Sequence, residues 1–343
     1  MIDSKLKVSK RLLMVGALAV ATFGAGIQMA AAQDKVKVGA LRFTSHAAGF
    51  IALEKGYFKE EGIDAEFVFF QAAQPIAVAM ASGDTDFGIA GMTGGFVNLA
   101  AKDALKAIGG VLREKKGVDG MAILASNKAY DAGLTSVDKL PGHSVALTQV
   151  GSTFHYMSSI IAGAKGFPLS DLKLTPLQKV GSMIGAIKSG QVDTMIMVPH
   201  IAKPLVSSGS AKLLGWLNEY TDDYQISVMA ASAKTISERP DVVKRFIKAY
   251  ARGIEEFNSV MLDQKDAAKV EELVKIIHKY VYADRPYDKA APPIKAGSMY
   301  LNEGVKLNVT DLTRQLEWMQ SEKLIPGTIT IDQVINKNFT ESY

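Results

Sequence analysis

Short apolar segments alternate with amphipathic segments along most of the chain, which is typical of an α/β protein. Residues 35–41, 65–70 and 86–90 have the composition of buried strands, and a segment with helical spacing follows each of them. Gly56 and Gly83 stand where the first helices must end, because glycine readily takes the left-handed conformation of a helix C-terminus. The pattern predicts a sheet of short strands that is flanked by helices.

The same arrangement occurs twice in the sequence. A helix, the motif Ser-Gly-x-x-Asp and an apolar strand follow one another in each copy. Gly83 and Asp86 of the first copy match Gly190 and Asp193 of the second, each 107 residues further on. A repeat of this length predicts two similar α/β lobes, since the repeats of solenoid proteins are much shorter. We expect both aspartates to be structural, with hydrogen bonds at a turn or at the entry to a strand.

The chain must cross between these lobes twice. We place the first crossing near residue 125, after an apolar strand, and the return at residues 225–231. Long amphipathic helices begin at residue 239, and we expect them to flank the first lobe. The predicted organisation is a signal peptide at 1–32, a discontinuous first lobe at 33–125 and 226–343, and a second lobe at 126–225.

The N-terminal segment predicts export. Four basic residues precede the uncharged apolar stretch 12–27, and Ala30-Ala31-Ala32 provides a site for cleavage after Ala32. A membrane anchor is the alternative, but the apolar stretch is short for a span. The segment contains four cations and one anion, so its removal lowers the net charge from +4 to about +1. A nearly neutral mature chain gives no support to nucleic-acid binding, and we expect a periplasmic, monomeric protein.

The residue types needed for several kinds of catalysis are missing. The sequence has no cysteine, which excludes disulfides, Cys-ligated zinc and thiol nucleophiles. It also contains no Gly-x-Ser-x-Gly, no His-Glu-x-x-His and no phosphate-binding loop that ends in Lys-Ser/Thr. We therefore expect a protein without catalytic activity, metal or cofactor. An enzyme of the same fold remains an alternative, and so does the effector domain of a regulator, which would need a helix-turn-helix partner.

Several segments resemble one known family. Residues 52–64 (Ala-Leu-Glu-Lys-Gly-Tyr-Phe-Lys-Glu-Glu-Gly-Ile-Asp) and 82–88 (Ser-Gly-Asp-Thr-Asp-Phe-Gly) look like the periplasmic binding proteins of ABC importers for nitrate, sulfonates, taurine and thiamine precursors. Residues 136–142 and 186–193 resemble the motifs of that family's second lobe, and residues 239–246 resemble its late helix. Each motif alone is weak, but the combination is specific and covers essentially the whole mature chain.

The resemblance implies a type II periplasmic binding protein fold, with two lobes joined by two crossover segments. It also implies that the lobes close on a small solute and that the protein delivers this solute to an inner-membrane ABC permease. The motifs do not name the solute. A pyrimidine-precursor binding protein, or an enzyme of the same fold from the thiamine pathway, is the alternative within the resemblance.

The loops that face each other across the two lobes are the predicted binding site, because ligands bind past the carboxyl ends of strands in open α/β sheets. Three of these loops lead into helix N-termini, whose free N–H groups and partial positive charge favour an anion. The second-lobe loops lack an obvious arginine, which argues against a dianion. We therefore expect a sulfonate or aromatic carboxylate, or else a neutral aromatic or heterocyclic solute.

Each candidate residue also has a structural alternative. The hydroxyl residues are suited to helix caps, and the aromatic residues and the methionine are suited to the core. His155, within the first turn of a helix, more often has a structural role. The predicted ligand-binding residues are Phe43, Thr44, Ser45, His46, Gly91, Met92, Thr93, Gln149, Gly151, Ser152, Thr153, Phe154, His155, His200 and Tyr224.

Overall fold

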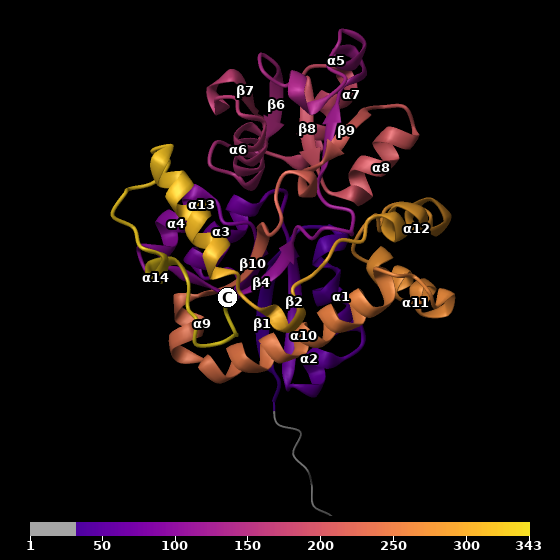
Figure 1. Ribbon diagram of the computed structural model, residues 1–343. Helices are drawn as coiled ribbons and strands as arrows, with labels where there is room; N and C mark the ends of the chain where they lie inside the picture. Colours follow the sequence, from indigo (N-terminus) through magenta and orange to yellow (C-terminus); the bar gives the residue numbers. More distant parts are fainter. Residues whose placement is uncertain (1–31) are drawn as a thin grey trace, which may run out of the picture. The chain divides into compact units, whose positions relative to one another are not determined.

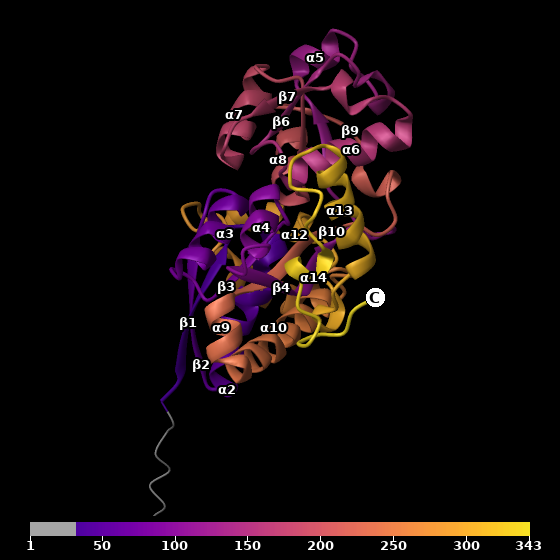
Figure 2. The same ribbon diagram turned by 90° about the vertical axis from the view of Figure 1, so that its left-hand side faces the viewer.

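Two five-stranded mixed sheets form the framework of the protein (Figures 1 and 2). The computed structural model describes residues 32–343, so the predicted signal peptide lies outside the described residues apart from Ala32. The first sheet contains, in spatial order, β2 (Ile63–Phe69), β1 (Asp34–Ala40), β3 (Phe87–Ala90), β10 (Gln225–Ser232) and β4 (Leu105–Arg113). The second contains β7 (Lys173–Pro176), β6 (Ser144–Leu147), β8 (Thr194–Met197), β5 (Ala122–Ala125) and β9 (Lys212–Trp216). The predicted α/β fold with two mixed sheets is confirmed.

Both sheets have the same topology. β1 pairs in parallel with β2 and β3, and β6 pairs in parallel with β7 and β8. Each sheet then takes an antiparallel strand from a distant part of the chain. β10 pairs with β3 in the first sheet, and β5 pairs with β8 in the second. The repeat in the sequence therefore corresponds to a repeat in the structure.

One predicted boundary is wrong. β5 pairs with β8 and β9, so residues 122–125 belong to the second sheet and not to the end of the first lobe. The first crossing therefore lies between the end of β4 at Arg113 and the start of β5 at Ala122. A short apolar strand has no local signal for the sheet that it joins, which explains the error. β10, which contains the predicted return crossing, pairs with β3 and β4 of the first sheet.

The repeated aspartates begin equivalent strands. Asp86 Oδ2 accepts the N–H of Lys37 in β1 at 2.8 Å, and Asp193 Oδ2 accepts the N–H of Ser144 in β6 at 2.8 Å. Asp86 also forms an ion pair with Arg239. Each carboxylate thus fixes one strand to the neighbouring parallel strand, and the structural role predicted for both residues is confirmed.

Helices cover both sheets (Figure 1). Those that accompany the first sheet are α1 (Ala47–Glu54), α2 (Tyr57–Glu60), α3 (Ala73–Ser82), α4 (Gly94–Ala100), α9 (Ala233–Glu238), α10 (Pro240–Met261), α11 (Ala267–His278), α12 (Tyr287–Ala296), α13 (Val309–Ser321) and α14 (Ile331–Val334). Those of the second are α5 (Asn127–Asp131), α6 (Thr153–Lys165), α7 (Val180–Ser189) and α8 (Pro199–Ser207). No helix in the described residues is long and apolar enough to cross a membrane.

The longest helix, α10, is the main support of the first sheet. Its buried face places the ring of Phe246 on that of Phe87 in β3, with centroids 3.9 Å apart. At Gly253 an added Cβ would lie 2.1 Å from the carbonyl oxygen of Ala48, so α10 and α1 can approach closely only with glycine there. This packing fixes α1, and with it the loop after β1 that leads to the site.

Candidate functional site

A small enclosed cavity lies where loops of the first sheet meet loops of the second. Its volume, measured as the space open to the centre of a water molecule, is about 60 Å³. Its walls come from the segment after β1, the ends of β3 and β4, the start of β10, and the N-terminal turns of α3, α6 and α7. This position, past the carboxyl ends of the parallel strands, is the usual place for a ligand in an open α/β sheet.

A larger hollow of about 930 Å³ lies elsewhere, over the first halves of β1 and β2. It is open to solvent and is lined by charged residues such as Lys35, Lys37, Asp64 and Glu66. It lies toward the amino ends of the strands, where α/β sheets rarely bind ligands. The smaller enclosed cavity is therefore the better candidate.

The structure brings six of the fifteen predicted ligand-binding residues together around this cavity. They come from the loop after β1, the end of β3 and the start of α6: Phe43, Ser45, His46, Gly91, Thr153 and Phe154. Other lining residues were not predicted, among them Leu112, Met121, Thr148, Met157, Ile226 and Ser227. Leu112, Met157 and Ile226 are apolar residues in strands or helices, which look like ordinary core in the sequence.

The lining contains polar residues but none that is charged at neutral pH. Its polar members are Ser45, His46, Thr148, Thr153 and Ser227. Burial lowers the pKa of His46 to about 3, so its imidazole is neutral. The N–H of Leu41 donates to His46 Nδ1 at 3.4 Å, which places the ring hydrogen on Nε2 and leaves this N–H as a donor. The cavity therefore combines neutral hydrogen-bonding groups with an apolar surface.

Two other predicted residues, Thr44 and His200, join the two lobes beside the cavity. Thr44 Oγ1 donates to the carbonyl oxygen of Gly297 at 2.9 Å and lies 3.0 Å from His200 Nδ1. Since the hydroxyl has one hydrogen, His200 Nδ1–H must be the donor to Thr44. Burial, followed by the proximity of His46, lowers the pKa of His200 to about 3. The neutral imidazole is thus part of the contact between the lobes and does not line the cavity.

Backbone groups close the junction on its other side. The N–H of Gly94 donates to the carbonyl oxygen of Gly151 at 2.9 Å. A Cβ at Gly91 would lie only 2.1 Å from Thr153 Cγ2. The end of β3 and α6 can therefore be in contact here only because residue 91 has no side chain. The structure therefore shows the two lobes in direct contact around an enclosed space.

The remaining hydroxyl candidates are helix caps. Thr93 Oγ1 accepts the N–H of Phe96 at the start of α4, and Ser152 Oγ accepts the N–H of His155 at the start of α6. Neither lines the cavity. Ser152 nevertheless fixes the N-terminal turn of α6, which presents Thr153 to the cavity.

Three further candidates also lie outside the lining. Met92 is buried in the core beside α4. Gln149 is half-buried in the loop before α6. His155 accepts the N–H of Gly151 on Nδ1 at 3.1 Å and packs edge-on against Trp318 of α13, with ring centroids 5.0 Å apart. Burial lowers the pKa of this histidine as well.

The last candidate, Tyr224, belongs to the crossover segments. It is fully buried, and its carbonyl oxygen accepts the N–H of Glu114 at 2.9 Å. Glu114 Oε1 in turn accepts the N–H of Met121, which lines the cavity, at 2.8 Å. Glu114 therefore connects both crossovers, and burial raises the pKa of its carboxyl to about 7. No signal in the sequence distinguished this residue.

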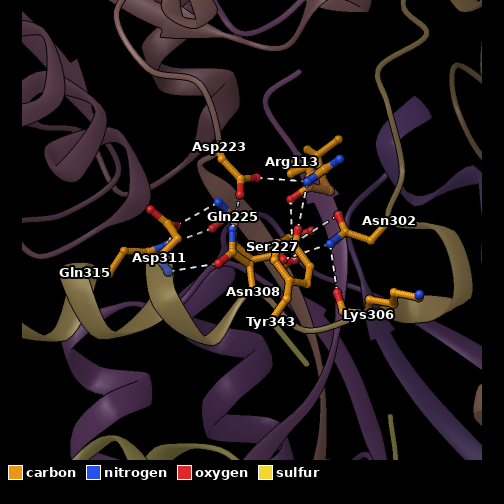
Figure 3. A network of polar contacts seen from close by, with 11 residues as sticks. Arg113, Asp223, Gln225, Ser227, Asn302, Lys306, Asn308, Asp311, Gln315 and Tyr343 are labelled. Atoms are coloured by element: carbon orange, nitrogen blue, oxygen red, sulfur yellow. Dashed lines mark hydrogen bonds and ion pairs between the residues drawn. The ribbon is translucent and has the colours of Figure 1, made fainter. Parts of the chain in front are cut away.

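A polar network fixes the start of β10 beside these crossovers (Figure 3). Asp311 Oδ2 accepts the N–H of Gln225 at 2.8 Å and a side-chain N–H of Gln315 at 2.7 Å. Arg113 donates to Asp223 at 3.0 Å and to the hydroxyl of Tyr343 at 2.8 Å. The return crossover is thus bound to α13 and to the C-terminal residue.

Comparison with known proteins agrees with this architecture. The family model described as NMT1/THI5 like matches residues 43–259. A protein of Bacillus subtilis (strain 168), provisionally assigned as aliphatic sulfonates-binding, is 26% identical over 209 residues, which are 60% of this chain and 60% of that protein. The chain therefore matches less than two thirds of the length of this curated relative.

Solved structures show the same fold. The alkanesulfonate-binding protein SsuA from Xanthomonas axonopodis pv. citri, bound to MOPS, is 17% identical, with coverage of 90% of this chain and 99% of that chain and a TM-score of 0.70. The periplasmic nitrate-binding protein NrtA from Synechocystis PCC 6803 is 14% identical, with coverage of 90% and 87% and a TM-score of 0.69. These likenesses confirm the predicted periplasmic binding protein fold, and the matched segment of more than half the sequence shows that the chain belongs to the NMT1/THI5-like family.

Proposed function

We propose that the protein is the solute-binding component of an ABC importer. It captures a small organic solute between its lobes and delivers it to an inner-membrane permease. The observation that supports this most is the enclosed cavity at the meeting of the two sheets, with walls from both. The binding proteins among its relatives support it too, and none of the relatives described above is named as an enzyme. The proposed location is the periplasm, which the mature protein would reach by means of the predicted signal peptide, and the proposed state is a monomer.

The solute is a monoanion with an apolar body. Thr153 and Phe154 both line the cavity at the start of α6, and the first N–H groups of a helix have no partner within it. These groups and the helix dipole favour one negative charge. No Lys, Arg, Asp or Glu side chain lines the cavity, so neither a second negative charge nor an ammonium group would find a counter-charge. This favours alkyl or aryl sulfonates and aromatic carboxylates over dianions and zwitterions.

The size of the cavity limits the solute. One water molecule needs about 10–15 Å³ of such volume, so 60 Å³ corresponds to roughly five waters. At about 30 Å³ of liquid volume for each water, five waters occupy roughly 150 Å³, the size of a cavity that holds benzene, so only a solute about as small as benzoate or ethanesulfonate fits. Phe43 and Phe154, from opposite lobes, provide aromatic surface for its body.

A thermal-shift screen of residues 33–343 tests the proposal. The panel pairs ethanesulfonate with taurine and benzoate with phthalate, and adds nitrate and a set of pyrimidines. A solute that binds only the folded protein raises the melting temperature by mass action. We expect shifts with the monoanions ethanesulfonate or benzoate, and none with the zwitterion taurine or the dianion phthalate. The function proposed here is contradicted if no member of any class raises the melting temperature.

A further inference from the structure

The carboxyl of Glu114 is buried without a counter-charge. The residue is 1% exposed, and no cation among residues 32–343 pairs with it. Its Oε1 accepts the N–H of Met121, whereas its Oε2 has no hydrogen-bond partner in this part of the chain. An ionised carboxylate in such surroundings costs much free energy, so the neutral acid is preferred.

The charged groups near Glu114 are engaged elsewhere. The pairs beside it in the sequence are Arg113 with Asp223, Lys115 with the ring of Tyr300, Lys116 with Asp222, and Asp119 with Lys203. From the return crossover Tyr224 faces Glu114, and burial, followed by nearby acidic groups that include Glu114, raises the pKa of this tyrosine. From the segment after β9, Asn218 faces the first crossover with a neutral amide. None of these groups supplies a positive charge to Glu114.

Glu114 lies where the two lobes are joined. It is the first residue after β4 of the first sheet, and Met121 is the last residue before β5 of the second. The 2.8 Å hydrogen bond from the Met121 N–H to Oε1 therefore links the two ends of the first crossover. The N–H of Glu114 donates to the carbonyl oxygen of Tyr224, just before β10, at 2.9 Å. One residue thus fastens both segments that must bend if the lobes open.

The first crossover itself encloses the carboxyl. A Cβ on Gly120 would lie 2.0 Å from Glu114 Oε2, so the backbone of this segment lies directly against that oxygen. Water can therefore reach Oε2 only if the segment moves. Ionisation of the carboxyl and movement of the crossover should favour each other, because a carboxylate needs water or donors that the closed arrangement lacks.

We propose that Glu114 is a pH-dependent hinge switch, whose neutral carboxyl holds the lobes closed and whose ionisation favours the open form. The inference goes beyond the proposed function, since it concerns the joint between the lobes and not the solute. Burial raises the pKa of Glu114 from 4.5 to about 7 in the closed arrangement. A hydrated carboxyl in the open form has its ordinary pKa, so closed molecules bind the proton more tightly. Closure is then favoured below pH 7 and is weakened as the pH rises through 7.

The buried histidines between the lobes have the opposite effect. Burial lowers the pKa of His46 and His200, so these residues favour closure as the pH rises. Comparison of the wild type with Glu114→Gln at each pH removes their contribution, because both proteins keep the histidines. Relative to the wild type, the ratio of closed to open molecules in Glu114→Gln should rise about ten-fold from pH 6 to pH 8.

The experiment measures closure directly in the ligand-free protein. The chain has no cysteine, so Val78→Cys and Lys188→Cys provide two specific sites for spin labels. Both positions are exposed, Val78 in α3 beside the first sheet and Lys188 in α7 beside the second. Pulsed electron paramagnetic resonance of labelled residues 33–343 gives the populations of closed and open distances at pH 6 and pH 8. No solute is needed, so the result is independent of the proposed function.

Two further variants complete the comparison. Glu114→Ala lacks the ionisable group and keeps the test valid if the amide of glutamine packs badly against Gly120. It should show the same ten-fold relative change. Glu303→Gln removes an exposed carboxyl and should follow the wild type at both pH values. The inference is overturned if the distance distributions of the wild type and both Glu114 variants respond equally to pH.

Discussion

The hydroxyl of Thr44 and the imidazole of His200 meet 3.0 Å apart at the junction of the two lobes. Thr44 follows β1 of the first sheet, and His200 lies in the first turn of α8 beside the second. Both side chains are buried, so their hydrogen bond must break before solvent can enter between these two elements. The contact therefore stabilises the closed arrangement directly beside the cavity.

Loss of this contact should favour an open form. Thr44→Val removes the acceptor of His200 Nδ1–H and the donor to Gly297, while it keeps the shape of the side chain. We expect a larger radius of gyration for the ligand-free protein in small-angle X-ray scattering, and solute affinity reduced about ten-fold because fewer molecules are closed. Thr313→Val, within α13, is the control, since Thr313 bonds only to its own helix at Val309. An unchanged radius and an unchanged affinity for Thr44→Val would show that the contact has no such role.

Acid should lower the free energy of unfolding, because it protonates the buried histidines more readily in the unfolded chain. Burial lowers the pKa of both His46 and His200 from 6.5 to about 3. Above pH 6.5 both imidazoles are neutral in the folded and in the unfolded chain, so their contribution to stability is complete. It is lost progressively as the pH falls from 6.5 toward 3. At pH 5 each histidine should cost about 2 kcal/mol of unfolding free energy. In urea unfolding, His200→Gln should lose less unfolding free energy between pH 6.5 and pH 5 than the wild type does. An identical loss in the two proteins would contradict this.

Glu114 should have the opposite effect on the pH dependence of stability. Burial raises its pKa from 4.5 to about 7, so its contribution to stability is complete below pH 4.5 and is lost as the pH rises through 7. Glu114→Gln keeps an acceptor for the N–H of Met121 and cannot ionise. We expect it to exceed the wild type in unfolding free energy by up to about 3 kcal/mol at pH 8, with little difference at pH 4.

The control for this comparison is the exposed Glu303→Gln. Its unfolding free energy should follow that of the wild type at both pH values. If Glu114→Gln also follows the wild type, then the carboxyl at the crossovers is not protonated in the folded protein at neutral pH.

The two repeated aspartates should matter for stability and not for binding. Asp193→Ala removes hydrogen bonds from the N–H and the hydroxyl of Ser144, at 2.8 and 2.9 Å. We expect a loss of about 2 kcal/mol in urea unfolding with unchanged solute affinity, because Asp193 does not line the cavity. Asp86→Ala should cost more, since Asp86 also pairs with Arg239. A specific loss of affinity in a stably folded Asp193→Ala variant would assign the residue to the binding site instead.

Local signals in the sequence were sufficient for most of the fold. Gly83 and Gly190 both take the left-handed conformation at the ends of α3 and α7, with φ of 83° and 71°, as the Ser-Gly motif predicted. The partner of β5 could not be predicted in this way, because strand pairing depends on the whole sheet and not on four apolar residues.

The site was predicted only in part, for a related reason. His46 and Thr153 follow strands closely, His46 in the helical turn after β1 and Thr153 at the start of α6, where position alone suggests a ligand. Ile226 and Ser227 lie within a strand that looks like plain core, so no local signal placed them at the cavity. His200 was recognisable by its position just after a strand, but its contact with Thr44 depends on the closure of the lobes.

The central claim is that the solute binds in the enclosed cavity, and a cavity-filling variant tests it most directly. Ala73, at the start of α3, lines the cavity, whereas Ala81, near the end of the same helix, does not. The measurement is the rise in melting temperature with the solute that stabilises the wild type, for Ala73→Leu and for the control Ala81→Leu. We predict an undiminished rise for Ala81→Leu and none for Ala73→Leu. An undiminished rise for Ala73→Leu would show that the solute binds elsewhere and would contradict the account.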